Sequence, residues 1–373
     1  SIFSNQGDNR MKKFLSLTLA VLLLLCCFTG CGNTKDDTVM TVNGQKIGWD
    51  EYTFWIGYAS MYLSYQYSMY GSEVEWLLEG ADGTTNAQWC VEYATETVTQ
   101  KGVIEAKCAE MGISLSEEEM EEVQKSIDDY KVQCCGEDAT DEQFESYLKT
   151  NQYSNLAVIR STQITSVLSN KLFEALYGTD GSNYTDEELL TMAAEKGYTK
   201  ANHILYLFTD EEGEVRSDAQ VAAGKAKLEG FMAELNAIED SEARYERFLE
   251  LKEENCEDGG TEAYQFGQGV MVEEFYDASI ALEPYELTIT ETDYGYHLMI
   301  GLPLELEYEV STGNGYTALK EVILGEIFGN DLQAWTEEAT VEYAKGFEDF
   351  DFSTMFTEGG YSYESWAERS AKK

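Results

Sequence analysis

One stretch, residues 201–301, constrains the fold of this chain more than any other. It opens and closes with an apolar strand pattern, and the chain's two histidines, His203 and His297, lie in these two strands. Helical patterns over residues 218–235 and 242–254 lie between them. A strand–helix–helix–turn–helix–strand order of this length has the size of an independent domain.

Several short motifs follow one another in this stretch. They are residues 201–205 in the first strand, 248–258 as a helix ending in an acidic turn, the pair Gly259-Gly260, a turn and short helix over 267–275, and 294–297 (Tyr-Gly-Tyr-His) in the last strand. Their order resembles the parvulin family of peptidyl-prolyl isomerases, over about 100 of the 373 residues. The resemblance implies a four-stranded antiparallel sheet flanked by helices, and an activity that rotates the peptide bond before proline.

The resemblance also implies a set of catalytic residues. His203 and His297 would face each other across the sheet, tied to Thr292 and to a residue of the acidic turn. That residue is Cys or Asp in the family, and an ungapped match gives its position to Asp258. A hydrogen-bonded network of this kind fixes the tautomers of the imidazoles and the local field.

An apolar surface for the proline ring is the second part of the implied site. Met271 and Phe275 are four residues apart on the predicted short helix, so they share one face. With Phe266 they would form the substrate-binding surface. The rotation barrier of roughly 20 kcal/mol reflects amide resonance, and crossing it requires no proton transfer and no covalent intermediate. The chemistry therefore calls for no cofactor and no metal.

Simpler interpretations exist for the same residues. A histidine on an apolar strand is more often a packed core residue than a catalyst, although two of them at matching motif positions favour active-site geometry. Met271 and Phe275 could be plain core, and Asp258 could be a solvated turn residue. The loop after Asp258 is also shorter than in the family. This departure motivates the alternative of a parvulin-fold chaperone without turnover.

The N-terminal part has the pattern of a bacterial export signal. Residues 11–13 (Met-Lys-Lys) precede an apolar run over 14–28, which is short for a membrane-spanning helix. The run ends in Phe-Thr-Gly-Cys at 28–31, which resembles a lipobox with Cys31 as the lipid acceptor, while Cys26 is a weaker alternative. Two acyl chains on Cys31 would anchor the mature chain at the extracytoplasmic face of the cell membrane.

Acidic residues dominate the charge of the chain. The 70 Asp and Glu against 25 Lys and Arg give a formal net charge of −45. Such a surface repels nucleic acid, so no nucleic-acid partner is expected. The excess suits a chaperone that must stay soluble beside its clients, and simple solvation is the plainer explanation. The cysteines after Cys31 are odd in number and lack metal-ligand spacing, so we expect reduced thiols.

The expected architecture is α+β, with an inserted sheet domain. The segments are 1–30 (upstream residues and signal peptide), 31–38 (lipidated tether), 39–197 (helical chaperone-like domain), 198–303 (parvulin-like domain) and 304–373 (C-terminal helix and acidic tail). A hairpin turn at Asn43-Gly44 followed by helices resembles the N-terminal half of PrsA-like and SurA-like foldases. An amphipathic helix over 317–343 is expected to pack back on those helices. The aromatic residues over 49–70 line a client cleft or fill the core.

These patterns predict a lipid-anchored, extracytoplasmic prolyl isomerase. It would assist the folding of unfolded or partly folded exported polypeptides by rotating their X-Pro bonds. The chaperone without turnover is the alternative. A solute-binding lipoprotein would share the anchor and the acidity, but this chain lacks the long α/β pattern that such receptors need.

Overall fold

The computed structural model describes residues 38–81, 83–151, 154–260, 262–312, 315–357 and 360–361. The chain divides into two compact units, one made of Ser1–Gly181 with Glu326–Lys373 and the other of Ser182–Gly325. The predicted signal peptide and Cys31 lie outside the described residues. Within the described ranges, no helix is both long and apolar enough to cross a membrane.

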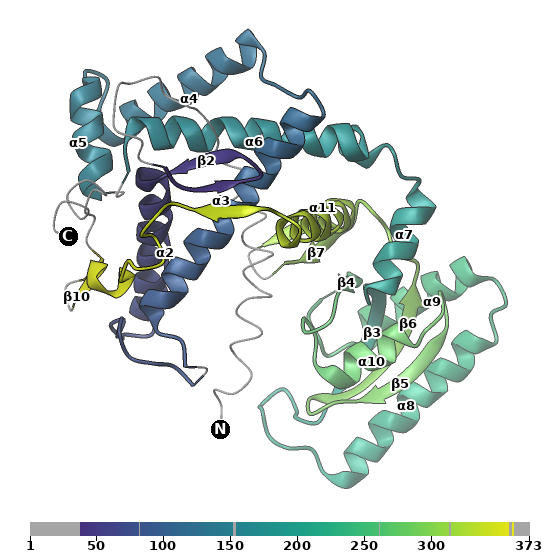
Figure 1. Cartoon of the computed structure of the whole chain (residues 1–373). Helices are drawn as coiled ribbons and strands as arrows, with labels where there is room; N and C mark the ends of the chain where they lie inside the picture. Colours follow the sequence, from purple (N-terminus) through teal and green to yellow (C-terminus); the bar gives the residue numbers. More distant parts are fainter. Residues whose placement is uncertain are drawn as a thin grey trace. The chain divides into compact units, whose positions relative to one another are not determined.

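The first unit opens with a hairpin and continues as a helical array (Figure 1). Its elements up to residue 181 are β1 (Thr38–Val42), β2 (Gln45–Gly48), α2 (Trp49–Met69), α3 (Asn86–Glu110), α4 (Glu117–Cys135), α5 (Asp141–Asn151), α6 (Leu156–Tyr177) and η1 (Thr179–Gly181). The turn residues Asn43 and Gly44 have φ of 48° and 84°, the left-handed conformation that an Asn-Gly pair favours. Thr85 and Ser116 begin α3 and α4 with capping boxes.

The C-terminal segment completes this unit. α11 (Leu319–Glu337) starts in the second unit and ends in the first, and β9 (Val341–Tyr343), η2 (Phe352–Met355), β10 (Phe356–Thr357) and β11 (Gly360–Tyr361) follow it. Asp331 of α11 accepts a 2.6 Å hydrogen bond from the Tyr177 hydroxyl of α6. Phe328 packs edge-on against Phe173 of the same helix. The later part of α11 therefore packs on a helix from the N-terminal half.

The helix predicted over residues 317–343 is wrong at its end. It stops at Glu337, and residues 341–343 pair with β1 as strand β9. The cause is distant in sequence, because Asn43 and Thr340 exchange two 2.8 Å hydrogen bonds. The Asn43 amide donates to the Thr340 carbonyl, and the Thr340 amide donates to the Asn43 side chain. These bonds set the following residues against β1, where the β-branched Val341 suits a strand.

The aromatic residues of α2 divide between core and surface. Trp49 and Tyr52, near its start, are fully buried, as the core interpretation predicts. Tyr65 and Tyr70, near its end, are 63% and 84% exposed. Core packing therefore accounts for the aromatic residues at the start of this helix but not for Tyr65 and Tyr70.

The second unit is built on a four-stranded antiparallel sheet in the order β4-β3-β6-β5. Its elements before α11 are α7 (Asp186–Glu195), β3 (Thr199–Leu207), α8 (Asp218–Asn236), α9 (Ser241–Asn255), β4 (Tyr264–Phe266), α10 (Glu273–Ile280), β5 (Leu287–Glu291), β6 (Gly295–Leu302), β7 (Glu309–Ser311) and β8 (Tyr316–Ala318). The predicted α+β class, with a four-stranded antiparallel sheet flanked by helices, is confirmed.

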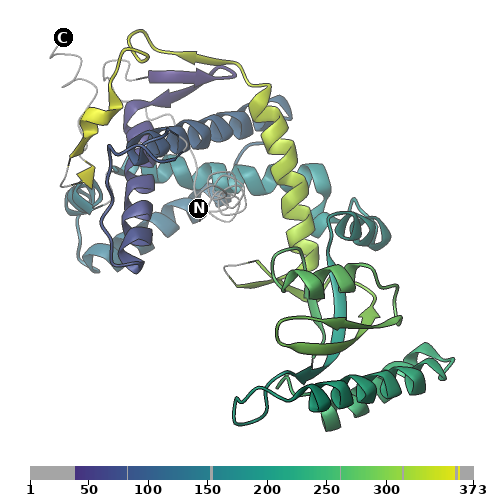
Figure 2. The same ribbon diagram turned by 90° about the horizontal axis from the view of Figure 1, so that it is seen from below.

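Helices cover both faces of this sheet. On one face, Leu228 of α8 and Phe248 of α9 share a buried cluster with Leu298 of β6. On the other face, Phe275 of α10 packs with Met299. Figure 2 shows α8 and α9, in teal green, below the sheet. Adjacent residues of β6 thus serve two separate hydrophobic clusters, as the alternation of a strand requires.

Candidate active site

The two histidines meet on the α10 face of the sheet. In the β3–β6 register His203 pairs with Met299 and Leu205 pairs with His297, so the imidazoles stand diagonally across neighbouring strands. Their Nδ1 atoms are 2.8 Å apart, and the ring planes are inclined by 10°. Each histidine is only 5% exposed. A hydrogen bond between two Nδ1 atoms requires a proton on one of them and a lone pair on the other.

The outer nitrogens of the two rings extend this contact into a chain. His203 Nε2 lies 2.9 Å from Asp258 Oδ2, and His297 Nε2 lies 2.9 Å from Thr292 Oγ1. The four residues predicted as catalytic therefore lie in one hydrogen-bonded network. Thr292 is 4% exposed, whereas the Asp258 side chain is 37% exposed. Asp258 is the end of the network that solvent can reach.

Asp258 reaches His203 because the chain after α9 runs along the edge of β3. Glu257 donates its amide to the Leu205 carbonyl at 2.9 Å, and the Leu205 amide donates to Cys256 Sγ at 3.3 Å. Arg216 holds the same turn through two 2.9 Å bonds to the Glu257 carboxylate. Backbone pairing on one side and an ion pair on the other thus fix the turn that carries Asp258.

The donors and acceptors of the network follow from its acidic end. Asp258 as a carboxylate accepts, so His203 Nε2 carries a proton and His203 Nδ1 is an acceptor. His297 Nδ1 then donates to His203, and His297 Nε2 accepts from the Thr292 hydroxyl. Both imidazoles are neutral in this assignment, and all four of their ring nitrogens have partners.

Electrostatics favours the same neutral state. Burial lowers the pKa of His203 below its ordinary 6.5, while the hydrogen bond to Asp258 opposes that shift. Burial, followed by repulsion from His203, lowers the pKa of His297 to about 4. The imidazole pair is therefore uncharged near neutral pH.

The depressed pKa of His297 predicts a pH dependence. We expect its ring nitrogens to keep the ¹⁵N NMR shifts of a neutral imidazole until the pH approaches about 4. The unfolded chain takes up this proton near its ordinary pKa of 6.5 and the folded chain does not. The stability contributed by the neutral ring is therefore lost progressively as the pH falls from 6.5 toward the folded pKa. A His297 titration centred near 6.5 would contradict this assignment.

An aromatic floor lies under the imidazoles. The Phe275 ring stands edge-on to both of them, with centroids 5.2 Å from His203 and 5.3 Å from His297. Phe275 and Phe266 are 4% and 1% exposed, so these two residues predicted to bind substrate lie mainly in the core. Met271 packs against the same cluster and is only partly buried. Of the three, Met271 has the most surface to offer a ligand.

Three residues that the motifs did not single out support the network. Tyr264 donates its hydroxyl to Asp258 Oδ2 at 3.3 Å. Lys252 is 3% exposed and donates to Asn202 Oδ1 at 2.7 Å, and the same oxygen accepts the His203 amide at 2.8 Å. Lys252 lies four residues after the buried Phe248, so the helical spacing could have revealed a lysine on an apolar face.

The described residues contain no cluster of three or more His, Cys, Asp or Glu side chains that could hold a metal ion. The network instead joins protein groups only to one another.

Comparison with known proteins gives a likeness among solved structures alone. No known protein-family model matches this chain, and no curated protein matches it either. It is similar to the PrsA peptidylprolyl isomerase of Bacillus anthracis, with 19% identity, a TM-score of 0.27, and coverage of 65% of this chain and 96% of that one. It is similar to the foldase PrsA of Streptococcus pneumoniae, with 17% identity, a TM-score of 0.22, and coverage of 74% and 97%.

The chain is also similar to a solved structure from the pair of SurA-like chaperones PEB4 and Cj1289 of Campylobacter jejuni. Its identity is 11%, its TM-score is 0.23, and the match covers 83% of this chain and 100% of that one. The resemblance to PrsA-like and SurA-like proteins noted in the sequence thus recurs among solved structures. The site is defined by the contacts of this chain's own residues.

Proposed function

We propose that the second unit catalyses cis–trans isomerisation of the peptide bond before proline in unfolded or partly folded exported polypeptides. One observation carries this proposal. A buried, neutral imidazole pair is hydrogen-bonded at one end to Thr292 and at the other to Asp258, whose side chain is 37% exposed. A satisfied polar network that holds one accessible carboxylate is typical of a preorganised site.

Asp258 is the group that meets the substrate in this proposal. A planar X-Pro amide carries a large dipole because of resonance, and rotation removes part of that charge separation. A carboxylate near the amide oxygen destabilises the planar form more than the twisted form. An apolar surface also withdraws the water that solvates the planar form. Met271, partly buried against the Phe275 cluster, offers such a surface to the proline ring.

The imidazoles position Asp258 and do not touch the substrate, because each histidine is 5% exposed. His203 and Tyr264 both bond Oδ2 of Asp258, at 2.9 and 3.3 Å. No described residue hydrogen-bonds Oδ1, which leaves this oxygen available to the substrate. His297 and Thr292 continue the hydrogen-bonded chain behind His203 and hold its ring in place. The role needs neither a cofactor nor the departure of a proton from the network.

A chaperone without turnover is the second candidate, and the first unit offers an observation that favours it. Several large apolar side chains are exposed near the end of α2 and in the loop that follows it. They are Tyr65, Met69, Tyr70, Leu77 and Leu78, which are 56% to 84% exposed. Exposed apolar surface of this kind suits the binding of unfolded polypeptides.

Two assays run side by side separate these functions. We expect the chain to accelerate the refolding of a protein whose slow phase is limited by a prolyl bond, and to suppress its aggregation. The His203→Ala variant should lose most of the acceleration and keep the aggregation effect. If the parent chain suppresses aggregation but leaves the prolyl phase unchanged, the isomerase proposal fails and the chaperone alternative stands.

The export-signal pattern at the N-terminus supports a proposal about where in the cell the protein works. We propose that Cys31 is lipidated and that the chain works at the extracytoplasmic face of a bacterial membrane, where exported clients fold. Labelled fatty acid should enter the parent chain and not the Cys31→Ala variant. Equal labelling of both would refute lipidation at this residue.

A further inference from the structure

The outer edge of β5 offers an unoccupied template for an added strand. We propose that this edge, with the groove beside it, binds an extended segment of another polypeptide as an antiparallel strand whose apolar and basic side chains alternate. The inference deepens the proposed function, because it adds a second place where the same unit holds a client. It does not depend on proline turnover.

The backbone of β5 is open on one side. β5 is the last strand of the sheet, and no described residue forms a backbone hydrogen bond with its outer edge. Thr292 donates its amide to Gly295 across the hairpin, and backbone groups alternate in direction along an antiparallel strand. The amides and carbonyls of Ile289 and Glu291 therefore point away from β6.

Apart from the charge of Glu291 at its end, this edge lacks the features that usually protect an exposed strand. Proline, lysine, a β-bulge or a very short strand commonly prevents edge-to-edge pairing. β5 reads Leu-Thr-Ile-Thr-Glu, with neither proline nor lysine, and its register with β6 is regular over all five residues. At the opposite edge of the sheet, β4 has only three residues. An open edge of this length is thus a feature of β5 alone in this sheet.

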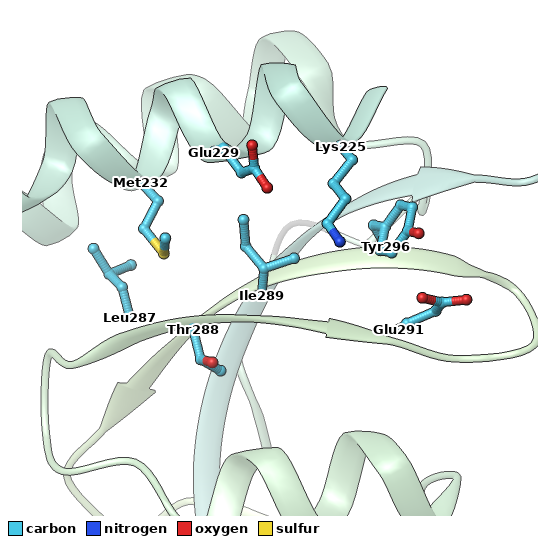
Figure 3. A pocket seen from close by; sticks show the side chains of 8 residues that line it. All are labelled: Lys225, Glu229, Met232, Leu287, Thr288, Ile289, Glu291 and Tyr296. Carbon is cyan, nitrogen blue, oxygen red and sulfur yellow. The ribbon is translucent and has the colours of Figure 1, made fainter. Parts of the chain in front are cut away.

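A groove accompanies the edge on its α8 side. It has a volume of about 480 Å³ and lies between α8 and β5 (Figure 3). Met232 of α8 contributes apolar surface from above, and Leu287 and Ile289 contribute it from the strand. Glu229 and Glu291 add carboxylates to the lining. The groove can take the side chains that an added strand would direct toward α8.

Charge and spacing determine the kind of strand that fits. Side chains of a paired strand alternate between the two faces of the sheet. On the α8 face they would meet the apolar Met232, Leu287 and Ile289, which favours valine or isoleucine. The lining also holds Lys225, whose charge is opposed by the carboxylates of Glu229 and Glu291. On the other face α10 begins beside β5, where the Glu274 carbonyl accepts from the Thr290 hydroxyl at 3.5 Å, and Glu273 and Glu274 carry negative charge. Basic side chains are favoured there.

A second copy of this chain is a poor occupant, because its net charge of −45 would repel the same acidic edge.

The edge also lies close to the imidazole pair. Thr290 of β5 is directly opposite His297 in the register. Only β5 would therefore separate a client strand from His297 and the network that ends at Asp258.

A labelled peptide tests the inference. The probe is a fluorescent, proline-free octapeptide in which valine and lysine alternate, titrated with the full chain and followed by anisotropy. In antiparallel pairing, residues opposite Ile289 share its face and direct their amides toward β5. N-methylation of the valines should weaken binding at least tenfold. N-methylation of the lysines, whose amides point to solvent, should change it less than threefold.

A variant of the protein gives a second arm. Ile289→Pro removes an outward amide without breaking a bond to β6, so it should fold and lose peptide binding. Loss on lysine methylation alone would contradict the antiparallel arrangement, because the lysine amides would face β5 only in a parallel strand. Absent binding, or equal losses from both methylations, overturns the inference. Because the probe lacks proline, such a failure leaves the isomerase proposal untouched, and an inactive enzyme leaves this inference untouched.

Discussion

Asp258→Asn should lower kcat/KM for a proline-containing peptide by about a hundredfold, the scale on which loss of one preorganised electrostatic group slows an enzyme. Asparagine keeps the shape of the side chain, and its oxygen can still accept from His203 Nε2. The negative charge disappears, and an NH₂ group takes the place of Oδ1. The variant therefore isolates the field of the carboxylate from the geometry of the turn. A protease-coupled isomerisation assay on a short proline peptide measures the effect.

Glu253→Gln is the matched control for this prediction. Glu253 belongs to α9, a few residues before Asp258, and it is exposed. Its substitution removes the same charge from the same part of the chain, so it corrects for the general effect of acidity. It should retain activity within about twofold. If the two variants behave alike, the carboxylate of Asp258 has no special role.

Phe275→Ala should reduce the free energy of unfolding of the second unit by about 3–5 kcal/mol. Phe275 is 4% exposed and packs between the Phe266 ring at 5.9 Å and the two imidazoles. Alanine would leave a cavity under the network, and surrounding side chains fill such a cavity only in part. Hydrogen exchange of the β3 and β6 amides reports the opening free energy of this unit within the whole chain.

Ile280→Ala, on the same helix, provides the comparison. Ile280 is 45% exposed, so its truncation should cost no more than about 1 kcal/mol. The difference between the two variants measures the packing of the aromatic floor. A loss below about 1 kcal/mol for Phe275→Ala would show that the ring is not an essential part of the core.

Local patterns were sufficient for much of the fold. The Asn43-Gly44 pair specified a hairpin because both residues adopt positive φ, and the Ser116 capping box marked the start of α4. The two histidine strands were recognisable from their apolar patterns. Their motif order also placed Asp258 and Thr292 beside the imidazoles, although nothing local in the sequence indicates that these four residues meet.

Features that depend on distant contacts could not be predicted in this way. β9 replaced the end of a predicted helix because Asn43 holds Thr340, almost three hundred positions away in the chain. Burial of Phe266 to 1% exposure follows from the packing of α10 on the sheet and not from its own motif. Lys252 became part of the site only through its bond to Asn202 on β3. Spacing identifies which face a residue occupies, and only tertiary packing decides what covers that face.

Exchange spectroscopy of a proline tetrapeptide is the most direct test of the proposed activity. Cis and trans forms give separate NMR signals, and exchange between them is far too slow to detect without a catalyst. With a catalytic amount of the full chain we expect exchange cross-peaks between the two forms. These cross-peaks should vanish with Asp258→Asn and persist with Glu253→Gln. Spectra without cross-peaks for the parent chain, while the ¹⁵N shifts show the neutral imidazole pair intact, would contradict the account.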